Sequence, residues 1–420
     1  MTLLEHFLVT LSVSTDSRKI KHGDIYFALK GSNFDGNEYA LEAFDRGAIL
    51  AVVDDKDIAK KDVRCFLVDN VLIALQDLAR EYRSLFDVPV LAITGSNGKT
   101  TTKELLACVI SKKYVPLVTF GNLNNHIGVP LTLLRARQEH NFFIIEMGAN
   151  HQGEIDELCK IANPNFGLIT NVGKAHLEGF GGIEGVKKGK AELYKSLENV
   201  NGIVFLNKDD EVLKTLCSKK LNCERYSVST EFLIIALEPL ISLSWKGKTI
   251  ATKLFGEFNI PNIAAAVKVG QYFGLEDDII IEAICEYKPT NNRSEILKIG
   301  TNSIILDAYN SNPSSLKASL SSFFKVGKLS KKIIVIGDML ELGKSTVEEH
   351  EAILKWIDTF KIKRKVYIGI NFYELRNHFQ GEFYKTIEEA RMIFNLESIN
   401  ESEIFLKGSR GIAVETLLSF

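Results

Sequence analysis

The strongest signal for chemistry is the run Thr94-Gly95-Ser96-Asn97-Gly98-Lys99-Thr100-Thr101, which follows an apolar strand pattern and precedes a helical one. Glycines in such a turn let backbone N–H groups approach phosphate oxygens, and the N-terminus of the following helix favours negative charge. Lys99 can then reach the β- and γ-phosphates, and Thr100 can ligate Mg²⁺. Ile93 stands five residues before Gly98, where a standard P-loop has glycine. The alternative is a tight strand-to-helix turn with a solvated lysine.

A magnesium ion beside phosphates needs an anionic ligand, and Glu146 is the best candidate. It ends the apolar run 142–145, and the carboxyl ends of parallel strands open onto the ligand crevice. His176 follows the next predicted strand and should project over the same crevice. A solvated charge is the alternative for Glu146. An isolated histidine is more often structural, and imidazole is not the usual ligand for Mg²⁺.

Further polar residues stand where a ligand could meet them. Asn259 and Asn262 begin a predicted helix and could cap it or bind an adenine; capping is the simpler interpretation for Asn259. Asp307 and Asp338 close two predicted strands, and Arg293 lies beside an expected break between domains. That position would let Arg293 swing onto a phosphate when domains close, although each of these residues has a purely structural alternative.

The elements that must position these residues alternate between short β-branched strands and longer helices, the order typical of α/β domains with parallel sheets. Pro89 and the segment 288–290 mark two breaks. We therefore predict three domains, 1–87, 88–290 and 291–420. A helix is predicted at 71–82 behind the cap Asn70, another at 259–273 and a third from Asn312-Pro313, and strands at 90–94, 142–147, 166–171, 202–206, 304–307, 333–336, 366–368 and 404–407.

Composition excludes several classes of protein. The 420 residues carry 51 basic and 53 acidic side chains, so no strong positive field exists to bind nucleic acid non-specifically. The six cysteines form no C-x-x-C pair, which argues against a zinc site or a disulfide framework. No apolar stretch approaches the ~18 residues of a membrane span. We expect a folded protein of a reducing cytoplasm.

Together these residues resemble the Mur ligase family over essentially the whole chain. The glycine turn has the family's own shortened spacing, which accounts for Ile93. Further segments that match the family are 121–130, 146–154, 175–181, 307–313, 337–343 and 407–410. The last three favour the member that adds D-alanyl-D-alanine to UDP-N-acetylmuramoyl tripeptide. Segments 14–18, 23–29 and 35–36 resemble the family's module for the UDP end of the substrate, although they also read as turns between strands.

The resemblance implies a small N-terminal α/β UDP-substrate domain, a central P-loop ATPase-like domain with a parallel sheet and a C-terminal Rossmann-like domain. Catalytic roles would fall to Lys99, Glu146, His176 and Lys190. It assigns ATP to Gly95, Ser96, Asn97, Gly98, Lys99, Thr100, Thr101, Asn262, Arg293 and Asp307; Mg²⁺ to Thr100, Glu146, His176 and Lys190; and substrate to Ser17, Arg18, Asn122, Asn125, Asn310, Lys407, Ser409 and Arg410.

Lys190 matches the lysine that the family carbamylates. An ammonium would be repelled by Mg²⁺, whereas a neutral lysine that captures CO₂ becomes an anionic oxygen ligand. Lys187 and Lys188 are neighbouring alternatives, and on composition alone all three form a solvated basic helix face. Two positions depart from the family: Phe258 stands where relatives often have histidine, and His126 where they often have an acidic or amide side chain.

The implied reaction is ATP-driven amide formation through an acyl phosphate, with closure of the third domain on substrate binding. Its partners would be UDP-N-acetylmuramoyl tripeptide and D-alanyl-D-alanine, and we expect a monomer without nucleic acid. Another ligase of this family, which adds a single amino acid or glutamate to a different carboxylate, is the nearest alternative. A nucleotide-binding regulator without turnover is the alternative from another class.

Overall fold

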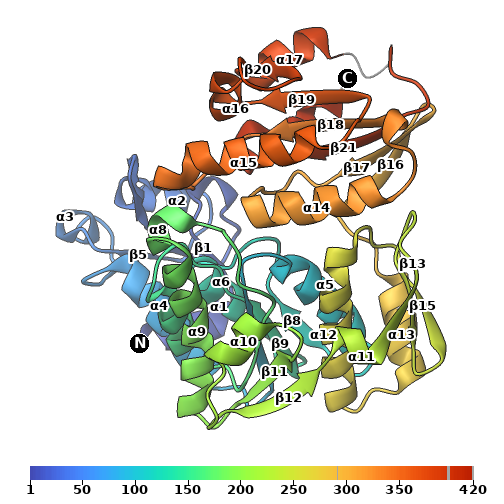
Figure 1. The fold of residues 1–420 in the computed structure, drawn as a ribbon. Helices are drawn as coiled ribbons and strands as arrows, with labels where there is room; N and C mark the ends of the chain where they lie inside the picture. Colours follow the sequence, from blue (N-terminus) through green and yellow to red (C-terminus); the bar gives the residue numbers. More distant parts are fainter. Residues whose placement is uncertain (291, 395–397, 419–420) are drawn as a thin grey trace.

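Three mainly parallel sheets divide the chain into three α/β parts in sequence order (Figure 1). The computed structural model describes residues 1–290, 292–394 and 398–418. Each of these sheets lies within one of the three predicted domains, and the α/β fold class is confirmed. The boundaries at 87/88 and 290/291 stay predictions, and residue 291 lies outside the described residues.

The N-terminal part is built on a small parallel sheet in the order β1-β2-β5-β6. Every residue of β2 and β5 is buried, as expected for strands covered on both faces. A two-stranded hairpin, β3 with β4, projects from this part. The elements are α1 (Leu3–Thr10), β1 (Val13–Ser14), β2 (Ile25–Phe27), β3 (Lys30–Gly31), β4 (Phe34–Asp35), α2 (Ala40–Asp45), β5 (Leu50–Val53), α3 (Lys56–Ala59) and β6 (Cys65–Leu67).

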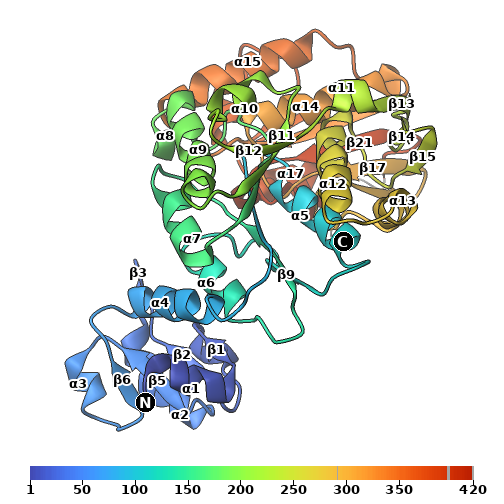
Figure 2. The ribbon, with the colours of Figure 1, turned by 90° about the horizontal axis from the view of Figure 1, so that it is seen from below.

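Helix α4 (Val71–Arg83) joins the N-terminal part to the central part (Figure 2). The side chain of Asn70 caps it by accepting from the backbone N–H of Ile73, as predicted. One side of α4 packs against α1, and another packs against the central helices α6 (Gly128–Leu133) and α7 (Glu154–Ala162). The Tyr82 hydroxyl donates to the carbonyl of Ala136 at 2.8 Å. The predicted first-domain helix therefore also serves as the interface with the second.

The central sheet has six parallel strands in the order β12-β11-β10-β7-β9-β8. Strand β7 has the predicted bounds, and β9 ends one residue earlier, at Glu146. The remaining elements are α5 (Lys99–Ile110), α8 (Leu177–Phe180), α9 (Ile183–Asn199), α10 (Glu211–Leu216), α11 (Val228–Glu231), α12 (Ile260–Tyr272), α13 (Asp277–Glu286), β7 (Val90–Thr94), β8 (Pro116–Val118), β9 (Phe142–Glu146), β10 (Phe166–Ile169), β11 (Ile203–Asn207) and β12 (Asn222–Tyr226).

A second, antiparallel sheet in the central part was not predicted from the sequence. It consists of β13 (Phe232–Ala236), β14 (Ser242–Trp245) and β15 (Lys248–Ala251). Leu243, Trp245 and Ile250 on its inner face are buried. Strand β15 packs against α13. The sheet therefore extends the hydrophobic core that lies under α12 and α13.

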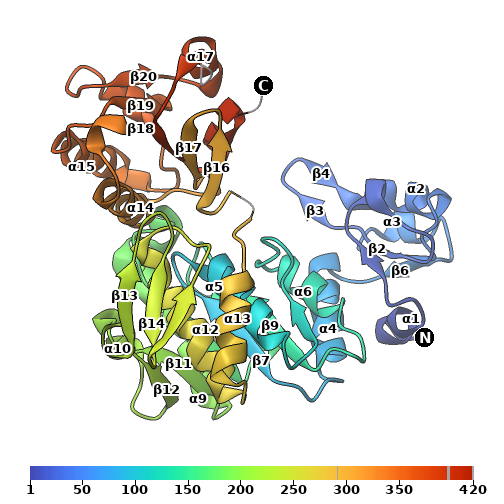
Figure 3. The same ribbon diagram turned by 90° about the vertical axis from the view of Figure 1, so that its right-hand side faces the viewer.

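The C-terminal sheet has the order β16-β17-β21-β18-β19-β20 and is parallel except for β16 (Figure 3). Asn312 caps α14 with a capping box that includes Ser315, where the sequence predicts a helix start. Within the described residues, no helix is both long enough and apolar enough to cross a bilayer. The elements are β16 (Glu295–Ile299), β17 (Asn302–Leu306), α14 (Pro313–Lys325), β18 (Lys332–Gly337), α15 (Thr346–Asp358), β19 (Arg364–Ile368), α16 (Ile370–Glu374), β20 (Glu382–Tyr384), α17 (Ile387–Ile393) and β21 (Glu403–Lys407).

Two arginines of α4 allow a test of this junction. Arg83 is 8% exposed, and its guanidinium donates to the carbonyls of Ala162, Phe86 and Asn163. Arg83→Ala leaves buried carbonyls without donors, so we expect it to lower the free energy of unfolding by about 2 kcal/mol or more. Arg80→Ala is the matched control, because Arg80 also bonds a carbonyl of α7 but its side chain is 49% exposed. Denaturant unfolding that gives equal losses for both variants would contradict this account.

Candidate active site

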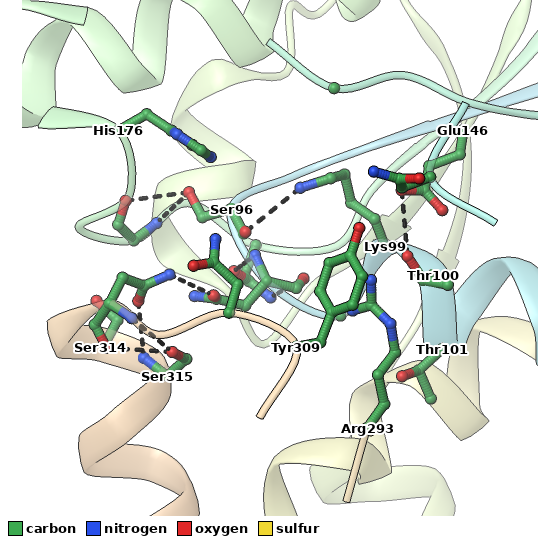
Figure 4. A pocket seen from close by; sticks show the side chains of 18 of the residues that line it. Ser96, Lys99, Thr100, Thr101, Glu146, His176, Arg293, Tyr309, Ser314 and Ser315 are labelled. Atoms are coloured by element: carbon green, nitrogen blue, oxygen red, sulfur yellow. Dashed lines mark hydrogen bonds between the residues drawn. The ribbon is translucent and has the colours of Figure 1, made fainter. Parts of the chain in front are cut away.

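A cavity of about 630 Å³ lies between the central and C-terminal parts (Figure 4). The central part lines it with the glycine turn, the loop 122–126 and the segments that follow β9 and β10. The C-terminal part lines it with residues at the ends of β17 and β21 and at the start of α14. Among the predicted site residues, those that line this cavity are Ser96, Asn97, Gly98, Lys99, Thr100, Thr101, Asn122, Asn125, Glu146, His176, Asn262, Arg293, Asp307, Asn310 and Lys407.

The glycine turn connects β7 to α5 and places Lys99 as the first residue of that helix. Gly98 has φ +79°, a conformation that glycine adopts without a steric penalty. The Lys99 Nζ donates to the carbonyl of Gly95 at 2.7 Å. Burial in the turn lowers the pKa of Lys99, and the charge of Arg293 adds to this effect while that of Glu146 opposes it. The ammonium therefore contacts carbonyls and has no carboxylate partner within the described residues.

Glu146 lies at the end of β9 and is only 1% exposed. The alternative interpretation, a solvated charge at the end of a strand, is therefore wrong. Its Oε1 accepts from Thr100 Oγ1 at 3.2 Å and from Asn124 Nδ2 at 2.8 Å. Its Oε2 has no hydrogen-bond partner in the part of the chain that the structure describes, although Lys103 Nζ lies 3.6 Å away. A buried carboxylate oxygen without a partner, next to a threonine hydroxyl, is a donor set that fits a hard cation such as Mg²⁺.

The structure groups no three His, Cys, Asp or Glu side chains around one point, as far as the described residues go. A cation here would therefore depend on phosphate oxygens and water for much of its coordination, which is the usual arrangement for Mg²⁺. His176 reaches the cavity from a left-handed backbone conformation, with φ +52°. Its Nδ1 lies against the carboxylate of Glu341, from the C-terminal part, without the geometry of a hydrogen bond. That contact holds the pKa of Glu341 below its usual range.

Lys190 is the one lysine among the three candidates that points into the protein. It is 1% exposed on α9, whereas Lys188 is exposed and Lys187 pairs with Glu184. Its Nζ lies 3.4 Å from the carbonyl of Ala149, a residue of the cavity wall. Burial, and secondly the charge of Lys99, lowers the pKa of Lys190 to about 7. Lys190 itself does not line the cavity but lies behind the wall, with a neutral amine available near neutral pH.

The C-terminal side of the cavity is organised by an ion pair. Asp307 directly follows β17, and Lys407 ends the neighbouring strand β21. Their side chains meet at 2.6 Å, and Ser319 donates to the same carboxylate. Lys407 also donates to the carbonyl of Asn310 at 3.1 Å. The carboxylate of Asp307 is thus paired within its own part of the chain.

Arg293 is the C-terminal cation that faces the glycine turn. Its guanidinium carbon lies 3.6 Å from the centre of the Tyr309 ring, and its Nε has no hydrogen-bond partner among the described residues. Figure 4 shows the Arg293 side chain next to the Tyr309 ring, close to Lys99 and Thr100. A cation stacked on a ring keeps its N–H donors free for an anion.

The structure places several predicted residues away from this cavity. Ser17 and Arg18 belong to the N-terminal part, where Arg18 pairs with Asp16 in solvent. Ser409 is buried and bonds the carbonyl of Ser311 and the N–H of Leu340, which is a structural position. Arg410 is exposed, and Gly95 lies outside the lining. Substrate contacts by Ser17, Arg18, Ser409 and Arg410 remain predictions.

The capping role expected for Asn259 is wrong. Its side chain makes no cap bond; it donates to the carbonyl of Phe255 and accepts from Asn262 at 2.9 Å. Pro261 in the first turn lacks an N–H, so α12 has one donor fewer to cap. The pair instead holds Asn262 beside Gly98 on the cavity wall.

Sequence reasoning missed residues that connect the parts of the site. Lys103 is 2% exposed and links α5 to Glu146 and to the carbonyl of Gly121. Asn312 donates to Asn97 Oδ1 at 2.7 Å, and Ser314 Oγ accepts from the N–H of Lys174 at 2.9 Å. Lys103 had a local signal, since it continues the glycine-turn segment. The contacts between the two parts had none, because they join residues more than a hundred positions apart.

Comparison with known proteins places the chain in a family. The family models described as "Mur ligase family, catalytic domain", "Mur ligase middle domain" and "Mur ligase, glutamate ligase domain" match residues 11–83, 93–270 and 292–410. A relative from Bacillus subtilis is 32% identical over 97% of this chain and 92% of its own length. The chain therefore belongs to the Mur ligase family. That relative is named UDP-N-acetylmuramoyl-tripeptide--D-alanyl-D-alanine ligase.

Solved structures give the same result at the level of the fold. A crystal structure of MurF from Acinetobacter baumannii superposes with a TM-score of 0.87 at 30% identity, covering 97% of this chain and 92% of that one. MurF from Thermotoga maritima in complex with ADP gives 0.84 at 26% identity, covering 100% and 97%. The similarity extends through all three parts of the chain.

The pKa of Lys190 predicts a specific pH dependence of stability. It is about 7 in the folded chain and 10.5 for an ordinary lysine, so between these values the unfolded chain binds more protons. The free energy of unfolding should therefore rise with pH in this window, by at most about 1.4 kcal/mol per pH unit, and fall again as pH drops towards 7. Lys190→Met should remove this contribution. Denaturant unfolding of both proteins at pH 7 and pH 9, in buffers free of CO₂, measures it; parallel changes would contradict the assignment.

Proposed function

We propose that this chain is an ATP-dependent ligase that joins D-alanyl-D-alanine to the terminal carboxylate of UDP-N-acetylmuramoyl tripeptide. The observation that carries the proposal is that the glycine-turn lysine, Lys99, and the strand-end carboxylate, Glu146, line one cavity with C-terminal residues. The full-length similarity to ligases with this name supports the substrate assignment. The product would be a peptidoglycan precursor.

ATP would lie with its phosphates on the glycine turn. Backbone N–H groups at the start of α5 and the ammonium of Lys99 would bind the phosphate oxygens. Thr100 and Glu146 would hold Mg²⁺, which when bound offsets the charge of the phosphates. Asn262 would contact the adenine, and Arg293 would add a second cation from the C-terminal part. His176 would be a further ligand of the Mg²⁺ ion.

The reaction would begin when the substrate carboxylate attacks the γ-phosphate and ADP leaves. The acyl phosphate that forms is then attacked by the amine of D-alanyl-D-alanine, which forms the amide and releases phosphate. The chain would contribute charge and orientation, which supply most of the catalysis in phosphoryl transfer. Asn312 donates to Asn97 across the two parts at the cavity wall, and contacts of this kind would help to exclude water from the acyl phosphate.

The other substrates would approach from the neighbouring walls. Ser17 and Arg18 of the N-terminal part would bind the UDP end, with Asn122 and Asn125 along the path to the cavity. D-alanyl-D-alanine would be bound by Asn310, Lys407 and Arg410. The hydroxyl of Ser409 would support them from behind, because it is already paired with Ser311 and Leu340. We expect the C-terminal part to dock on substrate binding, in a cytoplasmic monomer.

Lys190 would act as a carbamate. Its amine, with a pKa of about 7, is neutral in about half of the molecules at pH 7 and can attack CO₂; the new N–C bond gives a carbamate anion and releases one proton. The burial of Lys190 next to Ala149 supports this role over Lys187 and Lys188, which face solvent or a surface carboxylate. The anion would reduce the excess positive charge around Lys99.

Release of phosphate tests the proposed reaction. The purified chain with ATP, Mg²⁺ and UDP-N-acetylmuramoyl tripeptide should release phosphate only when D-alanyl-D-alanine is added. Lys99→Met should lower the rate by more than about 100-fold, because it removes the ammonium that would stabilise the negative charge of the transferred phosphoryl group. Release with single amino acids or glutamate instead would identify another ligase of this family. ATP binding without any release would identify a regulator.

Rescue experiments test the carbamate. Lys190→Ala should abolish turnover, and short carboxylates such as formate or acetate should restore part of it by replacing the carbamate anion. Lys187→Ala is the matched control and should keep the activity, since its ammonium pairs with Glu184 on the surface. Full activity of Lys190→Ala without added carboxylate would refute the carbamate.

A further inference from the structure

His176 has an unusual electrostatic environment for a candidate ligand. Its ring lines the cavity, yet its Nδ1 is buried and has no hydrogen-bond partner within the described residues. The group against that nitrogen is the carboxylate of Glu341, which comes from the other side of the domain interface. A neutral imidazole donates from one ring nitrogen and accepts at the other. A carboxylate beside Nδ1 therefore favours the tautomer with Nδ1–H and leaves the Nε2 lone pair free.

The loop that carries Glu341 is fixed within the C-terminal part. It follows β18, and at its start the Asp338 carboxylate accepts from the N–H groups of Asn371 and Phe372. The N–H of Met339 donates to His350 Nε2 at 3.1 Å. The N–H of Leu340, the next residue, donates to Ser409 Oγ at 3.0 Å. The residues just before Glu341 are thus anchored to the C-terminal part and not to the central part.

Glu341 is the tip of this loop and touches the central part twice. Its backbone is in the left-handed region, with φ +63°, which turns the residue out of the loop. Its carbonyl accepts from the N–H of Glu178, two residues after His176, at 3.3 Å. Its side chain, 54% exposed, contacts the His176 ring. Glu341 therefore contacts both the backbone of the turn after His176 and the side chain of His176.

We propose that Glu341 is a positioning residue that acts across the domain interface by fixing the ring and the tautomer of His176. Nothing on the central part replaces this carboxylate in the described residues, so His176 is set only when the C-terminal part is docked. Docking would thereby complete the catalytic site as well as close it. This inference rests on the proposed ligase function for its kinetic consequence, but its structural claim is independent of it.

Nitrogen NMR of the full chain, labelled in its histidines and free of metal and nucleotide, tests the structural claim. His176→Gln identifies the His176 signals. In the wild type we expect shifts of a protonated Nδ1 and an unprotonated Nε2. Glu341→Ala should lose this preference, whereas Glu341→Gln, whose amide oxygen still accepts, should keep it. Identical His176 shifts in the wild type and Glu341→Ala would overturn the proposal.

Kinetics separate positioning from a general weakening of the interface. Glu349→Gln is the matched control, because it removes the charge of another ion pair between the two parts, with Lys174, which does not contact the His176 ring. Glu341→Ala should lower kcat by about 10- to 100-fold with little change in the KM for ATP, and Glu341→Gln should recover most of this loss. Equal losses for Glu341→Ala and Glu349→Gln would overturn the proposal.

A wild-type chain without dipeptide-dependent turnover would refute the ligase function, and the NMR result would still decide the role of Glu341.

Discussion

The proposed reaction requires two anions, a terminal phosphate and a carboxylate, to meet in a confined cavity, and their repulsion is the constraint on which the rest depends. Two of the cavity's carboxylates are already matched by lysines: Glu146 by Lys103 and Asp307 by Lys407. Lys99 contacts only carbonyls and the Arg293 Nε has no partner, within the described residues. These two cations are therefore available for incoming negative charge. In a cavity of low dielectric their effect is larger than in water.

The cations come from different parts of the chain, which links the chemistry to the docking of the C-terminal part. The contacts across the interface include polar ones, such as the bond from Asn312 to Asn97 and that from the Lys174 N–H to Ser314. Polar interfaces between domains are typical of parts that separate and return. We expect such an interface to open for substrates and product and to bring Arg293 towards Lys99 when it closes. Glu341 would extend this dependence to the orientation of His176.

The sequence predicted the buried inner strands of the central and C-terminal sheets, because strands such as β7 are continuous apolar runs between polar ends. It gave no bounds for the short strands of the N-terminal sheet or for the edge strands β8, β12 and β20. It did not predict β13, whose Leu233, Ile234 and Ile235 are exposed and show no alternation between a buried and a solvent face. Site residues that follow strands or the glycine turn could be placed on one edge of a sheet from topology alone. The burial of Lys103 could not, since a lysine on a helix usually faces solvent. The contact of Glu341 with His176 depends on how two domains dock, and no local pattern encodes that.

The central claim is that the substrate carboxylate itself attacks the γ-phosphate of ATP. Tripeptide substrate with ¹⁸O in its terminal carboxylate tests this directly. A carboxylate oxygen forms the P–O bond in the first step, and its C–O bond breaks in the second step, so the oxygen leaves with the phosphate. Mass spectrometry of the released phosphate should show one ¹⁸O atom for each amide bond formed. Phosphate without the label would contradict the account.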